Sequence, residues 1–219
     1  MIDAVVFDLD GLLLDTERLW DEVREELARE RGGQWSDRAQ ADMMGMSSPE
    51  WSRYMHDVVG LPESPDEIAE EVVRRMVARY RERLPLIPGA LEAIERLAAH
   101  WPLGLASSSN RPLIDLALEL GGLGPFFAVT VSSEEVGRGK PSPDVYLEAV
   151  GRLGVEPAHA AAVEDSGNGI RSAHAAGLRV VAIPNAHFQP DEEALALADV
   201  VVDSLDELTP EVIDPDYSE

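Results

Sequence analysis

Two hydrophobic patterns divide the chain. Residues 4–7 form a short apolar run rich in β-branched residues, which is typical of a buried strand in a parallel sheet. Residues 16–84 instead place apolar side chains at helical spacing, as at Leu19 and Val23, and contain no strand-like run. From about residue 86, apolar strands alternate with amphipathic helices. This order predicts an α/β protein with a doubly wound, Rossmann-like parallel sheet and a small helical bundle inserted after the first strand.

The same alternation predicts the boundaries of the parts. We expect the core to comprise residues 1–14 and 86–219, and the helical insert to comprise residues 15–85. The acidic tail from Glu211 is expected to fray. Later strands are expected at residues 102–107, 127–131, 160–163, 178–183 and 200–202, with helices at 90–100, 112–120, 143–153 and 168–176.

Inside the insert, most apolar side chains are expected to fill the bundle. The methionines and Trp20 fit such a core better than they fit contacts to a ligand. The residues of the insert that could still reach a bound molecule are Trp20 and a run at a break between two helices: Met44, Gly45, Met46 and Ser47.

Polar clusters follow four of the apolar strands. Taken singly, each has a structural explanation, because strands end in turns and serines cap helices. Ligands of doubly wound sheets bind outside the carboxyl ends of the strands, and all four clusters are expected at that edge. The clusters are Asp8 with Asp10, Ser107 with Ser108 and Asn110, Lys140 in a Gly-Lys-Pro loop, and Glu164 with Asp165.

Composition narrows the possible partners. The formal net charge of −24 argues against binding to nucleic acid or to an anionic membrane surface. The chain has no cysteine, so disulfides and thiolate chemistry are excluded. Ile2 leads directly into the first strand without a leader, and no apolar run is long enough to span a bilayer. We expect a soluble cytoplasmic protein, a monomer or weak dimer.

Lys140 is the single lysine among 18 lysines and arginines. A compact ammonium fits between crowded carboxylates and a phosphate oxygen, where a planar guanidinium does not. The alternative is that this lysine is a compositional remainder without a special role.

These parts suit phosphoryl transfer. The paired aspartates Asp8 and Asp10 could be a solvated turn, but oxygen ligands in such a pair are also those that Mg²⁺ takes. An aspartate can attack phosphorus if its charge is screened, and Mg²⁺ with Lys140 would supply that screening. A second aspartate can protonate the leaving alcohol and then take a proton from water.

The motifs resemble the haloacid dehalogenase superfamily, in its β-phosphoglucomutase-like branch with a helical cap. The resemblance implies that Asp8 is the nucleophile, that Asp10 is the general acid and base, and that the insert closes over the site. It also implies catalytic Lys140, metal ligation by Asp8, Asp10, Asp165 and Glu164, and substrate binding by Ser107, Ser108, Asn110 and Glu17. The motifs that carry it are Asp8-Leu9-Asp10-Gly11 through Asp15-Thr16-Glu17, Ser107, Gly139-Lys140-Pro141, and Glu164-Asp165-Ser166 with Gly169.

The resemblance implies a Mg²⁺-dependent phosphatase for small phosphorylated metabolites such as sugar or polyol phosphates. The alternative is a phosphomutase of the β-phosphoglucomutase type. Family mutases carry a histidine where Trp20 stands and an arginine near Ser48, which holds a second phosphate; this chain has neither. A third alternative is a receiver-type signalling module, for which the insert and Asp10 would have no purpose.

Overall fold

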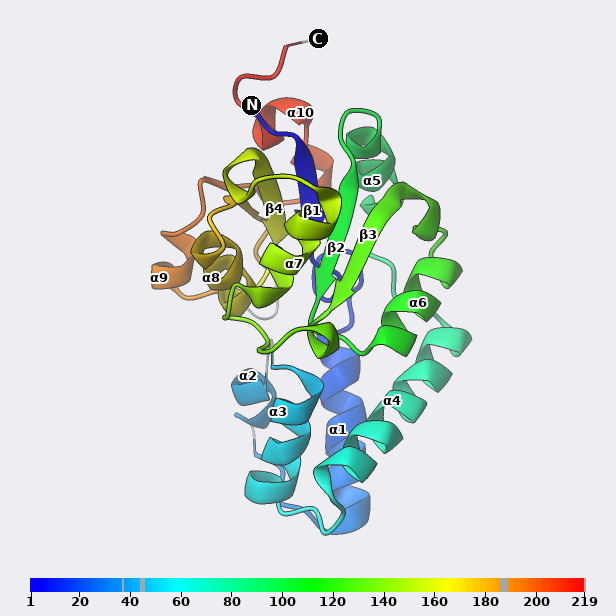
Figure 1. The fold of residues 1–219 in the computed structure, drawn as a ribbon. Helices are drawn as coiled ribbons and strands as arrows, with labels where there is room; N and C mark the ends of the chain where they lie inside the picture. Colours follow the sequence, from blue (N-terminus) through cyan, green and yellow to red (C-terminus); the bar gives the residue numbers. More distant parts are fainter. Residues whose placement is uncertain (37, 44–45, 186–188, 219) are drawn as a thin grey trace.

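A single parallel sheet runs through the larger part of the molecule. The computed structural model describes residues 1–36, 38–43, 46–185 and 189–218 (Figure 1). All strand pairs are parallel, and the strand order is β3-β2-β1-β4-β5-β6. The strands are β1 (Ala4–Phe7), β2 (Leu103–Ser107), β3 (Phe127–Ser132), β4 (Ala160–Glu164), β5 (Arg179–Ala182) and β6 (Val200–Val201).

Helices connect the strands of the core and also form the insert. The insert contains α1 (Glu17–Arg31), α2 (Ala39–Met43), α3 (Ser48–Tyr54), the π-helix η1 (Met55–Val59) and α4 (Pro65–Glu82). The core contains α5 (Ala90–Ala98), α6 (Arg111–Leu120), α7 (Asp144–Leu153), α8 (Gly167–Ala175), α9 (Glu192–Leu195) and α10 (Pro210–Ile213). Single 3₁₀ turns are η2 (Gly124–Phe126), η3 (Ser133–Glu135), η4 (Pro157–His159) and η5 (Leu205–Glu207).

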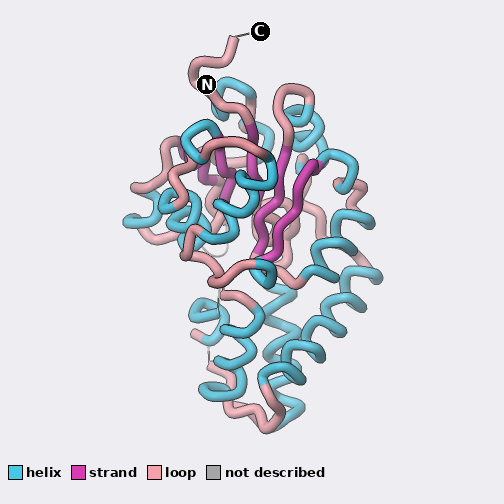
Figure 2. Tube along the Cα trace, viewed as in Figure 1, coloured by secondary structure: helices cyan, strands magenta, loops and turns pink. Residues whose placement is uncertain are grey.

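The alternation of side chains along β1 explains the layers. All four of its residues are buried, as expected for a central strand of a parallel sheet. Val5 and Phe7 belong to the apolar cluster that includes α5 and α6. Val6 belongs to a second cluster, with α7 and α8. Helices therefore cover both faces of the sheet (Figures 1 and 2), and the predicted doubly wound α/β fold is confirmed.

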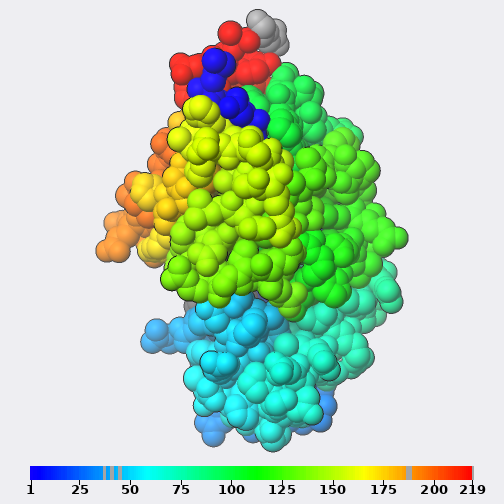
Figure 3. All heavy atoms as spheres, in the orientation of Figure 1, coloured from blue at the N-terminus to red at the C-terminus, as the bar shows by residue number. Residues whose placement is uncertain are grey.

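The insert gathers at the end of the molecule toward which the strands point, and both chain termini lie at the opposite end (Figures 1 and 3). Its two connections to the core run side by side. Leu14 pairs with Leu86 in an antiparallel bridge. The Asp15 N–H donates to the Pro85 carbonyl at 2.8 Å, and the Ile87 N–H donates to that of Leu13 at 2.9 Å. We call residues 17–82 the cap from here on.

The tail does not fray as predicted. Ile213 in α10 is buried, and the Asp214 carboxylate accepts a hydrogen bond from the Ile2 N–H at 2.8 Å. The Tyr217 ring packs on Trp101, with 5.5 Å between ring centroids. Apolar burial and these contacts outweigh the acidic composition of the tail.

In the part of the chain that is described, each helix is either too short or too polar to cross a lipid bilayer.

Candidate active site

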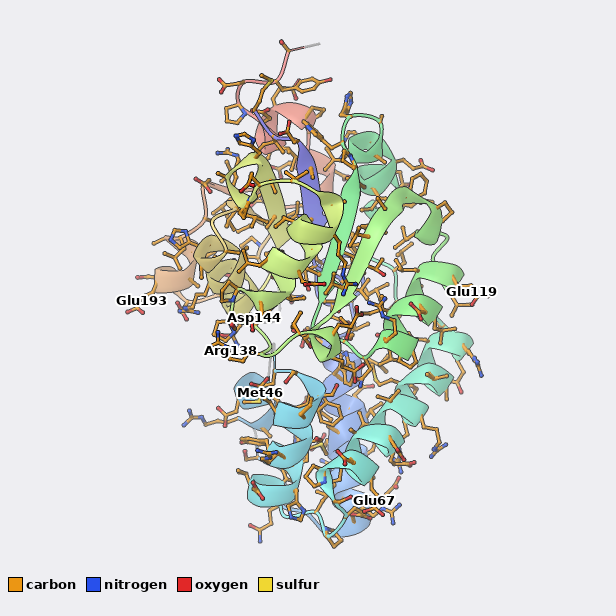
Figure 4. The ribbon with its side chains drawn as sticks, viewed as in Figure 1. Met46, Glu67, Glu119, Arg138, Asp144 and Glu193 are labelled. Carbon is orange, nitrogen blue, oxygen red and sulfur yellow. The ribbon has the colours of Figure 1, made fainter. Side chains whose placement is uncertain are left out.

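A partly open cavity of about 50 Å³, space for only a few water molecules, lies between the cap and the carboxyl edge of the sheet. Met46 marks the end of the cap that faces this edge (Figure 4). The core contributes Asp8, Asp10, Ser108, Ser109, Lys140 and Ser166 to the lining, and the cap contributes Glu17, Trp20, Arg24, Met43, Met46 and Trp51.

Lys140 joins two carboxylates from different strands. Its Nζ donates to Asp8 Oδ1 at 2.6 Å and to Glu164 Oε1 at 2.5 Å, and all three side chains are buried. Nζ also lies 5.0 Å from the centre of the Tyr146 ring. A short, compact cation fills this space, which supports the argument made from the single lysine.

Glu164 is fully occupied by protein donors. Besides Lys140, its Oε1 accepts from the Tyr146 hydroxyl at 2.8 Å. Its Oε2 accepts from the N–H groups of Asp165 and Ser166 at 3.1 and 3.2 Å, and from Ser166 Oγ at 3.2 Å. A Cβ on Gly169 would lie 1.8 Å from Oε1. Glu164 is therefore held in place as the partner that orients Lys140.

Asp165 differs sharply from its neighbour. Both of its carboxylate oxygens are buried, and no protein group in the described part of the chain donates a hydrogen bond to them. Gly11 has a φ of +86°, and a Cβ there would lie 2.0 Å from Asp165 Oδ2. Only glycine can pass this close to the carboxylate in that conformation.

The buried carboxylates form a set that can hold a cation. Carboxylate oxygens of Asp8, Glu164 and Asp165 lie within 4.8 Å of one another, and the Glu164 oxygens already accept from protein donors, which leaves Asp8 and Asp165 to hold an ion. Unpartnered buried carboxylate oxygens are costly unless a cation or a proton relieves them, and oxygen donors suit a hard divalent ion. The residues present therefore fit a metal ion of the Mg²⁺ type.

Asp10 lies at the cap side of the cluster and is held by hydroxyl groups. Its Oδ1 accepts from Thr16 Oγ1 at 2.6 Å and from Trp20 Nε1 at 3.3 Å. Its Oδ2 accepts from Ser109 Oγ at 2.6 Å and from Ser107 Oγ at 3.4 Å. This network fixes the carboxyl group at the cavity wall, where it can exchange a proton with a bound molecule.

Burial and like charges perturb the titration of the cluster. Burial, together with the negative charges of Glu164 and Asp10, raises the pKa of Asp8 to about 8 despite the attraction of Lys140. Burial and the charges of Glu164 and Asp8 hold the pKa of Asp165 well above its ordinary value. Burial disfavours the Lys140 ammonium, but Asp8 and Glu164 outweigh this and raise its pKa. Without a cation, the aspartates resist ionisation while the lysine stays charged.

The structure brings most of the predicted site residues to one place. Ser107 is buried beneath the lining, where its Oγ accepts from the Ser109 N–H at 3.0 Å. Ser108 and Glu17 line the cavity itself. Asn110 does not, because its Nδ2 donates to Glu134 Oε1 at 2.6 Å beside a different cavity.

Several lining residues were missed in the sequence. Ser166 belongs to the Glu164-Asp165-Ser166 motif but was assigned no contact, and Ser109 was not singled out, because sequence alone does not show which serine of a run faces inward. Trp51 was not singled out at all. Arg24 was missed although Glu17, Trp20 and Arg24 recur at helical spacing, which places them on one face of α1.

The candidate methionines and their neighbours divide between core and cavity. Met55 and Met76 are fully buried in the apolar core, as predicted. Met43 and Met46 line the cavity. Ser47 is instead the N-cap residue of α3. The candidates Met44 and Gly45 lie outside the described residues.

Comparison with known proteins extends these observations. Residues 2–177 match the family model described as haloacid dehalogenase-like hydrolase. The chain is 35% identical over 212 residues to hexitol phosphatase B of Escherichia coli K12, covering 94% of each protein.

Solved structures show the same fold. CbbY from Rhodobacter sphaeroides, in complex with phosphate, superposes with a TM-score of 0.86 and 31% identity, covering 98% of this chain and 100% of that one. β-Phosphoglucomutase from Clostridium difficile superposes with a TM-score of 0.83 and 25% identity, covering 96% and 95%. These matches confirm the predicted resemblance and the predicted class of enzyme: the chain belongs to the haloacid dehalogenase-like hydrolase family.

Proposed function

We propose that this phosphatase hydrolyses phosphate monoesters of small sugars or polyols, with Asp8 as the nucleophile and Mg²⁺ as the cofactor. One observation carries the proposal. Asp8 lies between a buried ammonium at 2.6 Å and a buried carboxylate, Asp165, that has no protein donor within the described residues. Such a site is built to gather positive charge around an attacking carboxylate.

The proposed reaction has two displacements at phosphorus. An oxygen of Asp8 attacks, the bond from phosphorus to the alcohol oxygen breaks, and Asp10 gives its proton to the departing alcohol. Water then attacks the aspartyl phosphate, Asp10 takes a proton from it, and inorganic phosphate leaves with Asp8 regenerated. We assign Lys140 and Ser108 to the phosphoryl oxygens, because both line the cavity that contains Asp8.

Asp8 and Asp165 are the side chains that would hold Mg²⁺, with Asp10 contributing its carbonyl oxygen. Bound Mg²⁺ would screen the repulsion between Asp8 and the phosphoryl group and stabilise negative charge on its oxygens. Glu164 is assigned to Lys140 instead, because five protein donors already occupy its oxygens.

The substrate class rests on the relatives. A protein named hexitol phosphatase B matches almost the whole chain, and a CbbY structure with phosphate shares the fold. The lining of the cap wall combines aromatic and methionine side chains with Glu17 and Arg24. Such a wall suits a small hydroxylated molecule better than a macromolecule.

The structural similarity to a β-phosphoglucomutase keeps a phosphomutase as the second candidate. The two activities differ in what accepts the phosphoryl group from Asp8. With β-glucose 1-phosphate and a trace of glucose 1,6-bisphosphate, a phosphatase releases inorganic phosphate and a mutase forms glucose 6-phosphate.

A phosphate-release assay over sorbitol 6-phosphate, mannitol 1-phosphate, glycerol 3-phosphate and hexose phosphates tests the proposal. We expect turnover of at least one polyol or sugar phosphate with Mg²⁺, loss of turnover with chelator, and acid-stable label on Asp8 after quenching. Full activity in chelator, or label on another residue, would contradict the mechanism.

A further inference from the structure

We propose that Tyr146 is a positioning residue for phosphoryl transfer, which holds the ammonium group of Lys140 beside Asp8 through two contacts, one made by its hydroxyl group and one by the face of its ring. The inference rests on the proposed function, because it assigns Lys140 to the reacting phosphoryl group. Within the described residues, the lining of the cavity does not include Tyr146, so this residue acts through its neighbours.

Tyr146 contacts both the lysine and the carboxylate that binds it. Its side chain is fully buried in the first turn of α7. Its hydroxyl donates to Glu164 Oε1 at 2.8 Å, and the same oxygen accepts from Lys140 Nζ at 2.5 Å. Nζ lies over the ring, 5.0 Å from its centre. Hydroxyl and ring therefore act on the two members of one buried ion pair.

Packing alone does not explain the hydroxyl group of Tyr146. The residue belongs to the apolar cluster of α7 and α8, where the ring of a phenylalanine would fill the same space, as that of Phe7 does on the other face of the sheet. A buried phenol needs a hydrogen-bond partner, and here the partner is a carboxylate of the site. Burial and the charges of Glu164 and Asp8 hold the pKa of Tyr146 well above its ordinary value, so the hydroxyl stays a donor.

The oxygen that Tyr146 and Lys140 share decides where the ammonium lies. An ammonium has three N–H donors. Two of them go to Asp8 Oδ1 at 2.6 Å and to Glu164 Oε1, and within the described residues the third is left for a phosphoryl oxygen. Because the hydroxyl also donates to Oε1, this oxygen attracts the ammonium less strongly than an unshared carboxylate oxygen would. The face of the ring adds a further attraction.

Loss of the hydroxyl group should draw the ammonium away from Asp8. In Tyr146→Phe, Oε1 of Glu164 loses a donor and becomes a stronger acceptor for Lys140. The other oxygen, Oε2, is still held by the backbone N–H groups of the next two residues, so the carboxylate stays in the site. A longer contact between Nζ and Asp8 screens the attacking carboxylate less and slows phosphoryl transfer.

The single lysine of the chain makes the position of the ammonium directly measurable. Protein labelled with ¹⁵N-lysine gives one side-chain ammonium signal by NMR, because Lys140 is the only lysine. The signal is compared in the wild type, in Tyr146→Phe and in Tyr217→Phe, without substrate and with chelator. Tyr217→Phe is the matched control, since it removes the same atom and a contact of the same 2.8 Å length, to His100 Nδ1, at the end of the molecule opposite the cap.

We expect the ammonium signal of Tyr146→Phe to shift and its hydrogens to exchange with water faster by about 10-fold or more. Tyr217→Phe should reproduce the wild-type signal. An unchanged signal in Tyr146→Phe, or the same change in Tyr217→Phe, would overturn the inference. The measurement needs no turnover, so it tests the positioning of Lys140 even if the wild type releases no phosphate and the proposed function fails.

A double-mutant cycle tests whether this position matters for the reaction. The single-turnover rate of Asp8 phosphorylation is measured for the wild type, Tyr146→Phe, Lys140→Ala and the double variant, after thermal melting has established that each is folded. We expect Tyr146→Phe to slow the reaction by about 10-fold when Lys140 is present and by less than about 2-fold when it is absent. No loss, or equal losses in the two backgrounds, would reject the role of Tyr146 and leave the phosphatase standing.

Discussion

At the scale of single residues, buried carboxylates a few ångströms apart have different partners and therefore different tasks. Glu164 is saturated with donors, so it can only hold Lys140 and the following loop. Asp165 has no protein donor in the described ranges and needs a cation. Asp10 accepts from hydroxyl groups that can reorient as its proton moves.

Substitution of the two aspartates should separate their roles. Asp8→Asn replaces the attacking carboxylate with a neutral, non-nucleophilic amide, so we expect no aspartyl phosphate and no turnover above background. Asp10→Asn keeps the nucleophile but loses proton transfer, so we expect turnover to fall by about 10²-fold or more. Rapid-quench measurement of labelled enzyme, beside steady-state kcat, checks both. An Asp8→Asn variant that still turns over would reject the assignment of the nucleophile.

Lys140 should not be replaceable by arginine. Its Nζ is enclosed by Asp8, Glu164 and the Tyr146 ring, and the wider guanidinium fork has no space there. We expect Lys140→Arg to lower kcat/KM nearly as far as Lys140→Ala does, by about 10²-fold or more. If Lys140→Arg keeps most of the activity, charge alone matters at this position and the steric argument is wrong.

At the scale of elements, the junction of β4 and α8 depends on one close approach. Gly169 in the first turn of α8 lies so near Glu164 that a Cβ would be 1.8 Å from Oε1. The Glu164 side chain cannot easily move away from an added Cβ, because Lys140 and Tyr146 donate hydrogen bonds to the same oxygen, Oε1. The glycine thus fixes how closely the helix follows the strand that carries the acidic pair.

We therefore expect Gly169→Ala to destabilise the fold by about 1–3 kcal/mol and to lower activity, since overpacking forces the helix or Glu164 to move. Gly151→Ala in α7 is the matched control, because nothing lies within 4 Å of the added Cβ. That variant should be neutral or more stable by up to about 1 kcal/mol. Urea unfolding measures both, and equal stability of the two variants would contradict the packing argument.

An ion-pair cluster ties α6 and α7 to the turn after β3. Arg111 and Arg152 both pair with Glu135, the latter at 2.8 Å. Burial opposes ionisation of Glu135, but these arginines prevail and lower its pKa from 4.5 to about 2. An acid whose pKa is lower in the folded state than in the unfolded state stabilises the fold at pH values above its unfolded pKa. This stabilisation is lost as the pH falls toward the folded pKa.

Glu135→Gln should accordingly lower the free energy of unfolding at pH 7 by about 1 kcal/mol, a modest value because the cluster is partly exposed. The difference from the wild type should shrink as the pH falls from about 4.5 toward 2. Urea unfolding across this range provides the measurement. A difference that stays constant with pH would show that the charge of Glu135 is not its cause.

At the scale of the whole molecule, core and cap share one cavity, and the charge enclosed there couples stability to ligands. The raised pKa of Asp165 means that its ionised form opposes folding of the metal-free protein, and the penalty grows as the pH rises above 3.8. A cation that binds the carboxylate removes the penalty and adds its own binding free energy.

For that reason Asp165→Asn should be more stable than the wild type without metal at pH 7, by about 1–2 kcal/mol. Mg²⁺ at about 100 times its Kd should stabilise the wild type by about 2.7 kcal/mol and leave the variant unchanged. Melting curves with chelator and with Mg²⁺ measure both effects. An equal Mg²⁺ response in the two proteins would place the metal elsewhere.

Much of the candidate site was visible in the order of residues along the chain. The apolar strands that end in Asp8, Ser107 and Glu164 predict a parallel sheet, and the carboxyl ends of parallel strands meet at one edge. Lys140 could be placed there by its Gly-Lys-Pro loop and by its isolation as the single lysine. These inferences hold because alternating strands and helices produce a parallel sheet, and this alternation can be seen in the local sequence pattern.

Other features depended on contacts between distant segments. The direction in which Asn110 points, toward Glu134, and the docking of the tail by Asp214 are not encoded in local pattern. Neither is the difference between Glu164 and Asp165, which are adjacent in sequence but have opposite hydrogen-bond environments. Such differences follow from which donors the folded chain brings within about 3 Å.

By itself, the sequence determined the doubly wound sheet, the inserted helices and the gathering of the acidic residues with Lys140 at the carboxyl edge, because hydrophobic periodicity and strand order act locally. Only the tertiary structure decided that Arg24 lies between two tryptophan rings on the cavity wall. That placement needs α1 and α3 to bring Trp20 and Trp51 together beyond the carboxyl edge of the sheet, and packing between separate elements leaves no local pattern in the sequence.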